Sequence, residues 1–481
     1  MTSDRAMDMK SQVRRLAQNA MALTAGGIVA QLVFTLVEVL IARKLGAASY
    51  GVFVTAYAWS VLGSIAMGLG TGMWTVQEGS RDHARIPALF GASLSVLGVG
   101  FALLYLGVLA AHALFPGNAV VALLLLLLPY GLILGLQTTL ASVYSCYQTM
   151  AINGLFQGAA PLGILVVWLL LPRDGISLEH VGFAYVIGGA AVTAGWLAFT
   201  LKRVRPKFEL AATLDVLKRS NQYAISNLLS QIYFRTDVVM LSAIGGIREA
   251  GIYAAAYKLV ELVSKTAVVA GRVFAPAIFK ASHEPGKAYR VFSSMMTRFM
   301  AIAGLVAGVT AFILADELIE LLFGESFVAS ASVLRILGGV MATRCMMVPL
   351  QLLLSSADLH FRRVAALGTV VAANIAANAI LIPLYGAEGA AWAALLSGAL
   401  LITLYAVSSS GRRELEFRRW LLTPTIIAAA IAGLAVVTDI NAFALAPLAV
   451  AIFLIGLILV GFVRGDEILF VLRSLLARGS R

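Results

Sequence analysis

Long apolar runs, separated by short polar segments, dominate the chain from one end to the other. A helix needs about 20 apolar residues to cross the hydrocarbon core of a bilayer, and fourteen runs approach or exceed that length. The pattern therefore predicts an all-α polytopic membrane protein. The expected spans lie at about residues 20–42, 50–73, 88–111, 119–140, 152–172, 181–201, 222–244, 250–271, 291–315, 331–355, 364–383, 386–408, 421–437 and 444–463.

The composition leaves almost no room for a soluble domain. Of the 481 residues, 60% are hydrophobic and 12% are charged, and the mean hydropathy is +0.91. Soluble domains are about half apolar and about a quarter charged. These values exclude a large catalytic, nucleotide-binding or receptor domain outside the membrane. The two cysteines are far apart and the five histidines lack the spacing of metal ligands, so we expect no disulfide framework, no metal site and no cofactor.

The distribution of basic residues predicts the orientation of the spans. Cytoplasmic loops of membrane proteins carry an excess of Lys and Arg. With the N-terminus inside, the inner segments contain 26 of the 36 Lys and Arg residues, whereas the outer segments contain only four. The same bias accounts for the net charge of +12 without a nucleic-acid partner. We therefore expect a multi-pass protein with both termini in the cytoplasm.

An internal repeat divides the chain into two halves. The segments that start at Gln31 and Gln231 match without gaps at an offset of 200 residues, and identical pairs include Gly46 and Gly246, Gly51 and Gly251, and Tyr57 and Tyr257. We therefore expect two pseudo-symmetric six-helix lobes, related by an axis along the membrane normal. The expected parts are an N-lobe with a surface helix (1–201), a basic cytoplasmic linker (202–221), a C-lobe (222–408), and an extra helix pair with an amphipathic cytoplasmic tail (409–481).

Four segments carry a resemblance to a known family. They are KLGAASYGVFVTAYAW, TDVVMLSAIGGIREAGIYAAAYKLVE, IELLFGESFVASASVLRIL and IPLYGAEGAAWAALLSG. In order and spacing they resemble bacterial polysaccharide (lipid-linked oligosaccharide or O-antigen) flippases of the multidrug/oligosaccharidyl-lipid/polysaccharide exporter superfamily. The resemblance covers nearly the whole chain and implies a V-shaped, two-lobe fold of about fourteen helices. It also implies movement of undecaprenyl-pyrophosphate-linked glycan between the leaflets of the bacterial inner membrane, alongside other polysaccharide-assembly proteins.

Ionisable side chains within the spans are the candidate functional residues, because charges in a bilayer are costly and usually face a cavity or each other. Six of the nine are basic, as a pyrophosphate-bearing cargo would require. Arg335, near the outer end of its span, is the weakest candidate. The candidates for a substrate cavity are Arg235, Lys258, Lys265, Arg298 and Arg344, and the candidates for an ion pair or for coupling to a proton or sodium ion are Glu38, Asp237 and Glu261.

The spacing of these residues leaves alternatives open. Lys258, Glu261 and Lys265 share one helix face, which is either an internally neutralised packing stripe or a cation-lined cavity wall. Arg344 lies near the middle of its span and either contacts cargo or pairs with a carboxylate such as Asp237 or Glu38. Arg235 and Asp237 are two residues apart and therefore point to opposite sides of their helix. Arg298 is either a snorkelling residue or a ligand contact.

The sequence favours a flippase for lipid-linked oligosaccharide over three alternatives. A cation-coupled multidrug exporter of the same superfamily usually has twelve helices and needs an acidic cavity for cationic drugs. A lipid II flippase is a nearer neighbour and stays open. A membrane-embedded glycan polymerase or ligase usually carries a long catalytic outer loop, but the longest outer connection here is about 15 residues (316–330). The only Gly-Lys pair is followed by Ala, which excludes a P-loop and ATP-driven transport through one in this chain.

Overall fold

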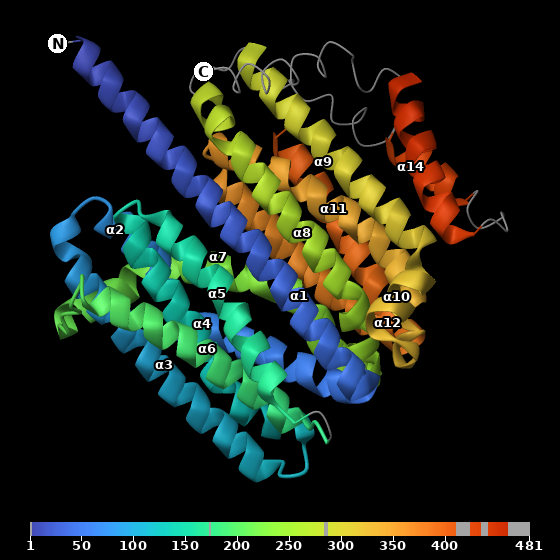
Figure 1. The fold of residues 1–481 in the computed structure, drawn as a ribbon, viewed down its shortest axis with the longest axis horizontal. Helices are drawn as coiled ribbons and strands as arrows, with labels where there is room; N and C mark the ends of the chain where they lie inside the picture. Colours follow the sequence, from blue (N-terminus) through green and yellow to red (C-terminus); the bar gives the residue numbers. More distant parts are fainter. Residues whose placement is uncertain (1, 173–174, 283–286, 410–423, 434–440, 460–481) are drawn as a thin grey trace.

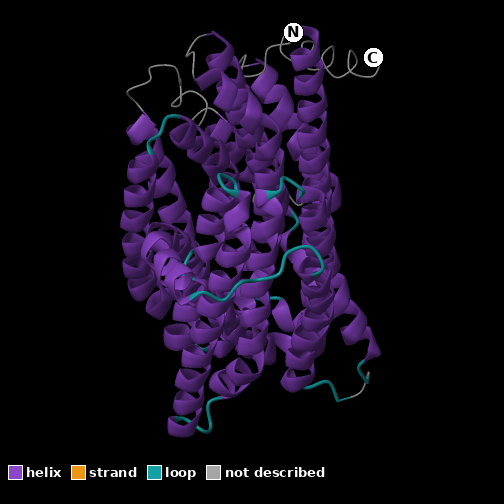
Figure 2. Ribbon diagram, turned by 90° about the vertical axis from the view of Figure 1, so that its left-hand side faces the viewer, coloured by secondary structure: helices purple, strands orange, loops and turns teal. Residues whose placement is uncertain are grey.

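The computed structural model describes residues 2–172, 175–282, 287–409, 424–433 and 441–459, and these ranges contain helices and no strand (Figure 2). A bilayer offers no water to a free N–H or C=O group, so a spanning chain must satisfy its backbone within each segment. Among the described residues, seven helices are long and apolar enough to cross a membrane. The expected all-α membrane fold is therefore confirmed.

The helices follow the apolar runs in order. In the first half they are α1 (Thr2–Gly68), α2 (Thr71–Gly79), α3 (Ile86–Leu114), α4 (Ala119–Cys146), α5 (Met150–Leu170) and α6 (Leu178–Leu201). In the second half they are α7 (Leu210–Met240), α8 (Ile247–Ser282), α9 (Lys287–Ile313), α10 (Ala315–Phe323), α11 (Ser330–Ser356), α12 (His360–Ser409), an unlabelled helix at 424–433 and α14 (Ala442–Leu459). Short helical turns η1 (His83–Arg85), η2 (Leu241–Gly245) and η3 (Glu325–Phe327) join some of them.

Two pairs of expected spans are joined without a loop. The first two form α1, which is kinked at Gly46 (φ 73°), and the eleventh and twelfth form α12, which is kinked at Gly386 (φ 55°). Glycine adopts a positive φ without the steric cost that a Cβ atom imposes. One glycine therefore replaces a polar connection, which hydropathy alone does not predict. The basic linker expected at 202–221 is also shorter than predicted, because α7 already begins at Leu210.

The repeat is visible where α1 crosses α8. A Cβ atom on Gly51 would lie 1.8 Å from the carbonyl oxygen of Ile247, and one on Gly251 would lie 2.0 Å from that of Ala47. Gly251 is the repeat equivalent of Gly51, and Ile247 is that of Ala47, at the offset of 200 residues. The same contact is therefore made once from α1 to α8 and once from α8 to α1. This reciprocity places the pseudo-twofold axis between the two glycines. Figure 1 shows α1 passing between α2–α6 on one side and α8–α12 on the other.

The end of the molecule that contains Gly46 is closed by contacts between the halves; we call it the Gly46 end. Tyr50 of α1 packs edge-on against Phe327 of η3, with ring centroids 5.8 Å apart. Within the second half, Glu249 of α8 accepts a hydrogen bond of 2.9 Å from the backbone N–H of Ala387, directly after the kink in α12. These contacts hold α1, α8, η3 and α12 together at the expected outer end.

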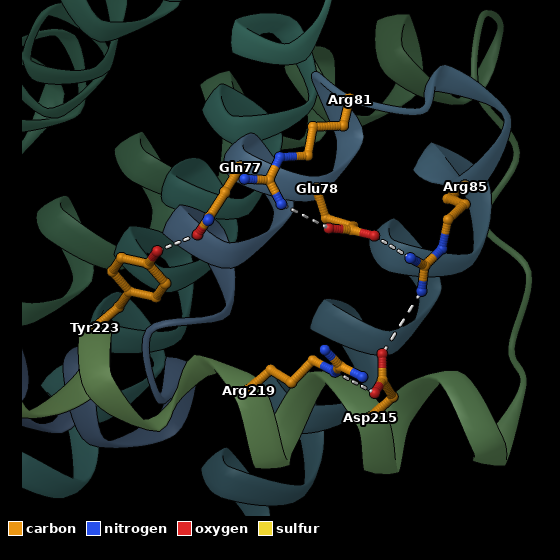
Figure 3. Close-up of polar contacts among 7 residues, drawn as sticks. All are labelled: Gln77, Glu78, Arg81, Arg85, Asp215, Arg219 and Tyr223. Atoms are coloured by element: carbon orange, nitrogen blue, oxygen red, sulfur yellow. Dashed lines mark hydrogen bonds and ion pairs between the residues drawn. The ribbon is translucent and has the colours of Figure 1, made fainter.

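At the opposite end, the first turns of α7 pack against the first half of the chain (Figure 3). Asp215 of α7 lies 3.6 Å from Arg85 and accepts a 2.6 Å hydrogen bond from Nε of Arg219. The bond to Asp215 raises the pKa of Arg219. Tyr223 donates a hydrogen bond to the side-chain oxygen of Gln77 at the end of α2. The start of α7 is thus attached to α2 and η1, while its later turns lie among α1, α8 and α12.

The C-terminal helices lie at the edge of the bundle. Apolar residues of 424–433 and α14 pack against α9, where Ile431 and Phe453 contact a layer that includes Val309. Figure 1 shows α14 on the outer side of α9, away from α1. The basic segment at 410–423 and the expected amphipathic tail after residue 459 lie outside the described residues.

Candidate functional site

Most of the intramembrane charges gather where α1, α7 and α8 meet. They form two groups on either side of α7, as the two-residue spacing of Arg235 and Asp237 predicts. Arg235 faces Tyr57 of α1 and Glu261 of α8. Asp237 faces Tyr253 of α8 and the second half of the bundle. We call the first group the lysine cluster and the second the aspartate cluster.

The lysine cluster consists of Glu38, Arg235, Lys258 and Glu261. Nζ of Lys258 lies 2.5 Å from the Glu38 carboxylate and 2.6 Å from that of Glu261. Nη1 of Arg235 lies 3.4 Å from the second oxygen of Glu261. Tyr50 donates a 3.2 Å hydrogen bond to Glu38. Since Glu38 belongs to α1 and Lys258 to α8, the cluster ties the two halves of the repeat together.

The cluster is buried on one side and accessible on the other. The side chains of Glu38 and Lys258 are only 2% and 6% exposed, whereas those of Glu261 and Arg235 are 18% and 21% exposed. Lys265, two turns after Lys258, is exposed and has no carboxylate within 4.0 Å among the described residues. The two cations and two carboxylates of the lysine cluster balance each other when all are ionised, so the excess of one positive charge in this region comes from Lys265 beside the cluster. On α8, Lys258 is thus paired with Glu261, whereas Lys265 lies outside the ion pairs of the described residues.

Arg344 of α11 lies in an aromatic cage. Its guanidinium carbon is 4.4 Å from the ring centres of both Tyr233 and Phe234, and its Nη2 donates a 3.0 Å hydrogen bond to the hydroxyl of Tyr257. Aromatic faces attract a guanidinium through their negative quadrupole, most strongly where water is excluded. The residue is 4% exposed, and its Nε is buried without a hydrogen-bond partner. In the described part of the chain no carboxylate lies within ion-pair distance, so neither Asp237 nor Glu38 pairs with it directly.

The aspartate cluster is a buried chain of oxygen-bearing side chains. Asp237 accepts hydrogen bonds of 2.9 Å from Tyr253 and 2.8 Å from Nδ2 of Asn378. Asn378 also donates to Asn374, which in turn donates to Ser397 at 3.2 Å. All of these side chains are at most 3% exposed. The carbonyl oxygen of Asn378 is buried without a partner, which leaves an acceptor beside a single carboxylate.

Such a set of groups suits a small monovalent cation or a proton. Hard cations prefer carboxylate, amide and hydroxyl oxygens, and one carboxylate balances one positive charge. No group of three His, Cys, Asp or Glu side chains able to hold a metal occurs in the described ranges. The carboxylate of Asp237 and the unpartnered carbonyl oxygen of Asn378 are the oxygens that would contact a monovalent ion there.

A tyrosine pair links the aspartate cluster to Arg344. The rings of Tyr253 and Tyr257 are stacked, with centroids 5.5 Å apart; Tyr253 binds Asp237 and Tyr257 binds Arg344. The repeat-equivalent Tyr57 also contacts an arginine, because Arg235 lies 5.4 Å over its ring. Each half therefore places a tyrosine at the same repeat position against a guanidinium, that of the partly exposed Arg235 or of the buried Arg344.

Sequence reasoning missed the neutral partners. Tyr50, Tyr253, Asn374, Asn378 and Ser397 each bond to a charged residue or continue its network. Two of these residues could have been identified from the sequence. Asn374 and Asn378 lie four residues apart within an expected span and so place two amide groups on one helix face, which indicates a buried polar contact.

Two of the predicted residues lie outside both clusters. Arg298 is on α9, and none of the contacts that define the clusters involves it. Arg335 forms an ion pair with Asp316, where both side chains are well exposed near the expected outer end. A role for Arg298 in the substrate cavity stays a prediction, whereas the exposed ion pair of Arg335 agrees with its place as the weakest candidate.

Comparisons with solved structures reveal one shared fold. The lipid II flippase MurJ in an inward closed conformation is 14% identical, with a TM-score of 0.70, and the match covers 91% of this chain and 98% of that one. An inward-facing multidrug resistance MATE family transporter of the MOP superfamily is 14% identical, with a TM-score of 0.64 and coverages of 82% and 97%. A MOP superfamily transporter from Pyrococcus furiosus is 12% identical, with a TM-score of 0.62 and coverages of 83% and 95%.

Sequence comparison identifies the family. No protein of curated function matches the sequence. The profile of the family described as "Polysaccharide biosynthesis protein" matches residues 16–282, which is more than half of the chain and includes α1 to α8 with the lysine cluster. The chain is therefore a multi-pass membrane protein that belongs to the polysaccharide biosynthesis protein family and has the transporter fold of the MOP superfamily.

Proposed function

We propose that the protein is a flippase that moves undecaprenyl-pyrophosphate-linked oligosaccharide from the cytoplasmic to the periplasmic leaflet. It acts in surface or exopolysaccharide biosynthesis, in the bacterial inner membrane, with both termini in the cytoplasm. The observation that carries the proposal is the lysine cluster together with the neighbouring Lys265: where the two halves meet, these residues have an excess of one positive charge, accessible at Arg235 and Lys265. Separation of α1 and α8 at the Gly51–Gly251 crossing opens the Gly46 end and, in alternation with opening of the opposite end, provides alternating access.

The chemistry of the cargo explains why cations are needed there. A pyrophosphate carries at least one negative charge per phosphorus, and unaided transfer of such charge into hydrocarbon is prohibitive. Arg235 offers a rigid fork of donors, and Lys265 offers a compact point charge. Lys258 is held by two carboxylates, so it contributes little net attraction until one of them is displaced. The polyprenyl chain can remain in the lipid while the headgroup crosses.

The aspartate cluster is the proposed coupling site. A proton or a sodium ion at Asp237 would neutralise a carboxylate that is 2% exposed and has only neutral hydrogen-bond partners. Occupancy there changes the hydrogen bond from Tyr253, and through the stacked Tyr257 it changes the environment of Arg344. The ion gradient thereby biases which arrangement of the two halves is populated.

Two alternatives use the same fold. A lipid II flippase would bind the same polyprenyl pyrophosphate through the same cations and differ only in headgroup, and the likeness to MurJ favours it as the second candidate. A multidrug exporter for cationic compounds fits the positive excess of the lysine cluster together with Lys265 poorly, because like charges repel. Other polysaccharide-assembly proteins are the expected partners.

A transport assay in proteoliposomes tests the proposal. Fluorescent undecaprenyl-pyrophosphate-linked oligosaccharide is reconstituted with the protein, and its transfer is followed by quenching from outside. The Lys265→Ala variant should flip the cargo at least about tenfold more slowly, whereas Arg335→Ala, which removes an exposed pair outside the clusters, should match the wild type. Flipping of lipid II but not of the glycan lipid would favour the second candidate. Extrusion of a cationic dye alone would overturn the proposal.

A further inference from the structure

An apolar hollow of about 420 Å³ lies at the seam between the first half of the chain and α7. It is formed by α1, α3, α4 and α7, on the side of the α1–α7 contact that faces away from the lysine cluster. Residues that line it include Trp59, Leu104, Leu128, Ile232 and Val239.

The hollow is suited to hydrocarbon. Thr236 is the only lining side chain with a hydrogen-bonding hydroxyl, and that hydroxyl donates to the backbone oxygen of Ile232 at 2.6 Å, so it seeks no other partner. Trp59 and Leu228, at its rim, are 46% and 38% exposed. These positions belong to membrane-embedded helices, where an exposed apolar side chain faces lipid. An apolar tail could enter the hollow past these two exposed side chains.

Arg235 of the lysine cluster lies close along α7 to residues that line the hollow. On α7, Arg235 lies between the hollow-lining Ile232 and Val239 in the helical net, but its guanidinium turns to Tyr57 and Glu261. Arg235 thus lies within about one turn of α7 from two residues that line the hollow, while its guanidinium belongs to the lysine cluster.

We infer that the hollow binds the isoprenoid tail of the cargo while the pyrophosphate contacts Arg235 on the other side of the α1–α7 seam. The inference rests on the proposed function, because it assumes a lipid-linked pyrophosphate. A molecule with an anionic head and a long apolar tail must satisfy both parts at once. A cation and an apolar hollow within about one turn of each other on α7 match that requirement, whereas a soluble anion or a neutral lipid would use only one of them.

A matched pair of α3 variants tests this assignment. Val108 lines the hollow, whereas Leu106, two residues earlier, is 61% exposed on the lipid face. Val108→Trp fills the hollow, and Leu106→Trp adds the same bulk outside it. Affinity in nanodiscs is measured for two pyrophosphate-linked sugars that differ only in tail, undecaprenyl and citronellyl.

Val108→Trp should weaken binding of the undecaprenyl compound about tenfold and leave the citronellyl compound unchanged. Leu106→Trp should change neither. Equal losses for the two compounds, or no loss for either, would overturn the tail site while leaving the flippase proposal intact. If the wild type binds neither compound, the proposed function fails and the tail site fails with it.

Photo-crosslinking identifies the occupant independently of folding effects. A diazirine placed in the tail of the undecaprenyl compound should label the α7 segment around Leu228 and Ile232 in the wild type, and Val108→Trp should abolish the label. Labelling of this segment by a diazirine-bearing phosphatidylcholine, undiminished by excess undecaprenyl compound, would show that bulk lipid fills the hollow and would overturn the inference.

Discussion

Gly51 of α1 packs directly against the carbonyl oxygen of Ile247 in α8, and the repeat makes the same contact again between Gly251 and Ala47. No side chain fits at either glycine while the two helices cross at this distance. The Gly46 end is therefore closed by backbone packing, and its opening requires α1 and α8 to separate.

Gly51→Ala should favour the state that is open at the Gly46 end, because a Cβ atom would lie 1.8 Å from the oxygen of Ile247. Strain of this kind costs about 1–3 kcal/mol. A cysteine placed at Phe327, which is fully buried, should then react faster with a membrane-impermeant maleimide. Gly98→Ala is the control, since no atom lies within 4 Å of the added methyl group. Equal labelling of the two variants would show that the crossing is not the closed gate.

Removal of Lys258 should destabilise the protein, because it leaves Glu38 buried at 2% exposure without its counter-charge. Breaking one partner of a buried pair typically costs about 3–5 kcal/mol. Lys258→Met alone should therefore lower the unfolding temperature strongly, and Glu38→Gln with Lys258→Met should restore most of the loss. Thermal unfolding of the two single variants and the double variant gives the coupling energy. Additive effects would mean that the ion pair does not join the halves.

Much of this architecture was predictable from the sequence, and the reason is physical. The hydrocarbon core selects apolar runs of a set length, and the repeat at an offset of 200 residues pointed to Gly51 and Gly251. Hydropathy cannot detect a kink that needs no polar residue, so the continuous helices through Gly46 and Gly386 were not predicted.

The candidate site was predictable only in its charges. Glu38, Asp237 and Arg344 can be recognised in the sequence because a charged side chain within an apolar run is rare and its burial is costly. The burial of a neutral side chain such as that of Asn378 or Tyr253 costs less free energy, so these residues are common in apolar runs and do not mark a site. Which lysine is paired and which is free depends on α1 lying beside α8, a long-range contact that spacing within one helix does not determine. Lys258 and Lys265 are seven residues apart on one helix, yet only Lys258 reaches Glu38.

Arg344→Lys should impair transport although it preserves the charge. A lysine ammonium cannot stack flat against Tyr233 and Phe234 while also bonding to Tyr257, as the planar guanidinium does. We expect the flipping rate to fall about tenfold, equivalent to roughly 1.4 kcal/mol. The proteoliposome assay checks this, with Arg335→Lys as the control at an exposed pair. If Arg344→Lys flipped the cargo at the wild-type rate, position 344 would need only a positive charge and not the planar shape of a guanidinium.

Asp237→Asn should uncouple transport from the ion gradient. The substitution keeps the shape of the side chain but removes the charge that a proton or sodium ion would balance; the amide oxygen can still accept from Asn378, and the Tyr253 hydroxyl can accept from the new amide NH2 group. The wild-type flipping rate should increase with an imposed proton or sodium gradient, and that of the variant should not respond to either. Thr369→Ala, on the exposed face of α12, is the control. A gradient response that persists in Asp237→Asn would exclude this cluster as the coupling site.

Two kinds of contact hold the start of α7 to the first half, and their magnitudes differ. The Arg85–Asp215 pair is exposed, with side chains 44% and 35% accessible, and such pairs contribute about 0–1 kcal/mol. Gly70 is enclosed, since a Cβ atom there would lie 2.5 Å from the backbone nitrogen of Ala224, and its φ of 73° also disfavours any other residue. Asp215→Asn should therefore leave the unfolding temperature nearly unchanged, whereas Gly70→Ala should lower it by the equivalent of at least about 2 kcal/mol. The reverse order would mean that the charge network of Figure 3, rather than close backbone packing, attaches α7 to α2.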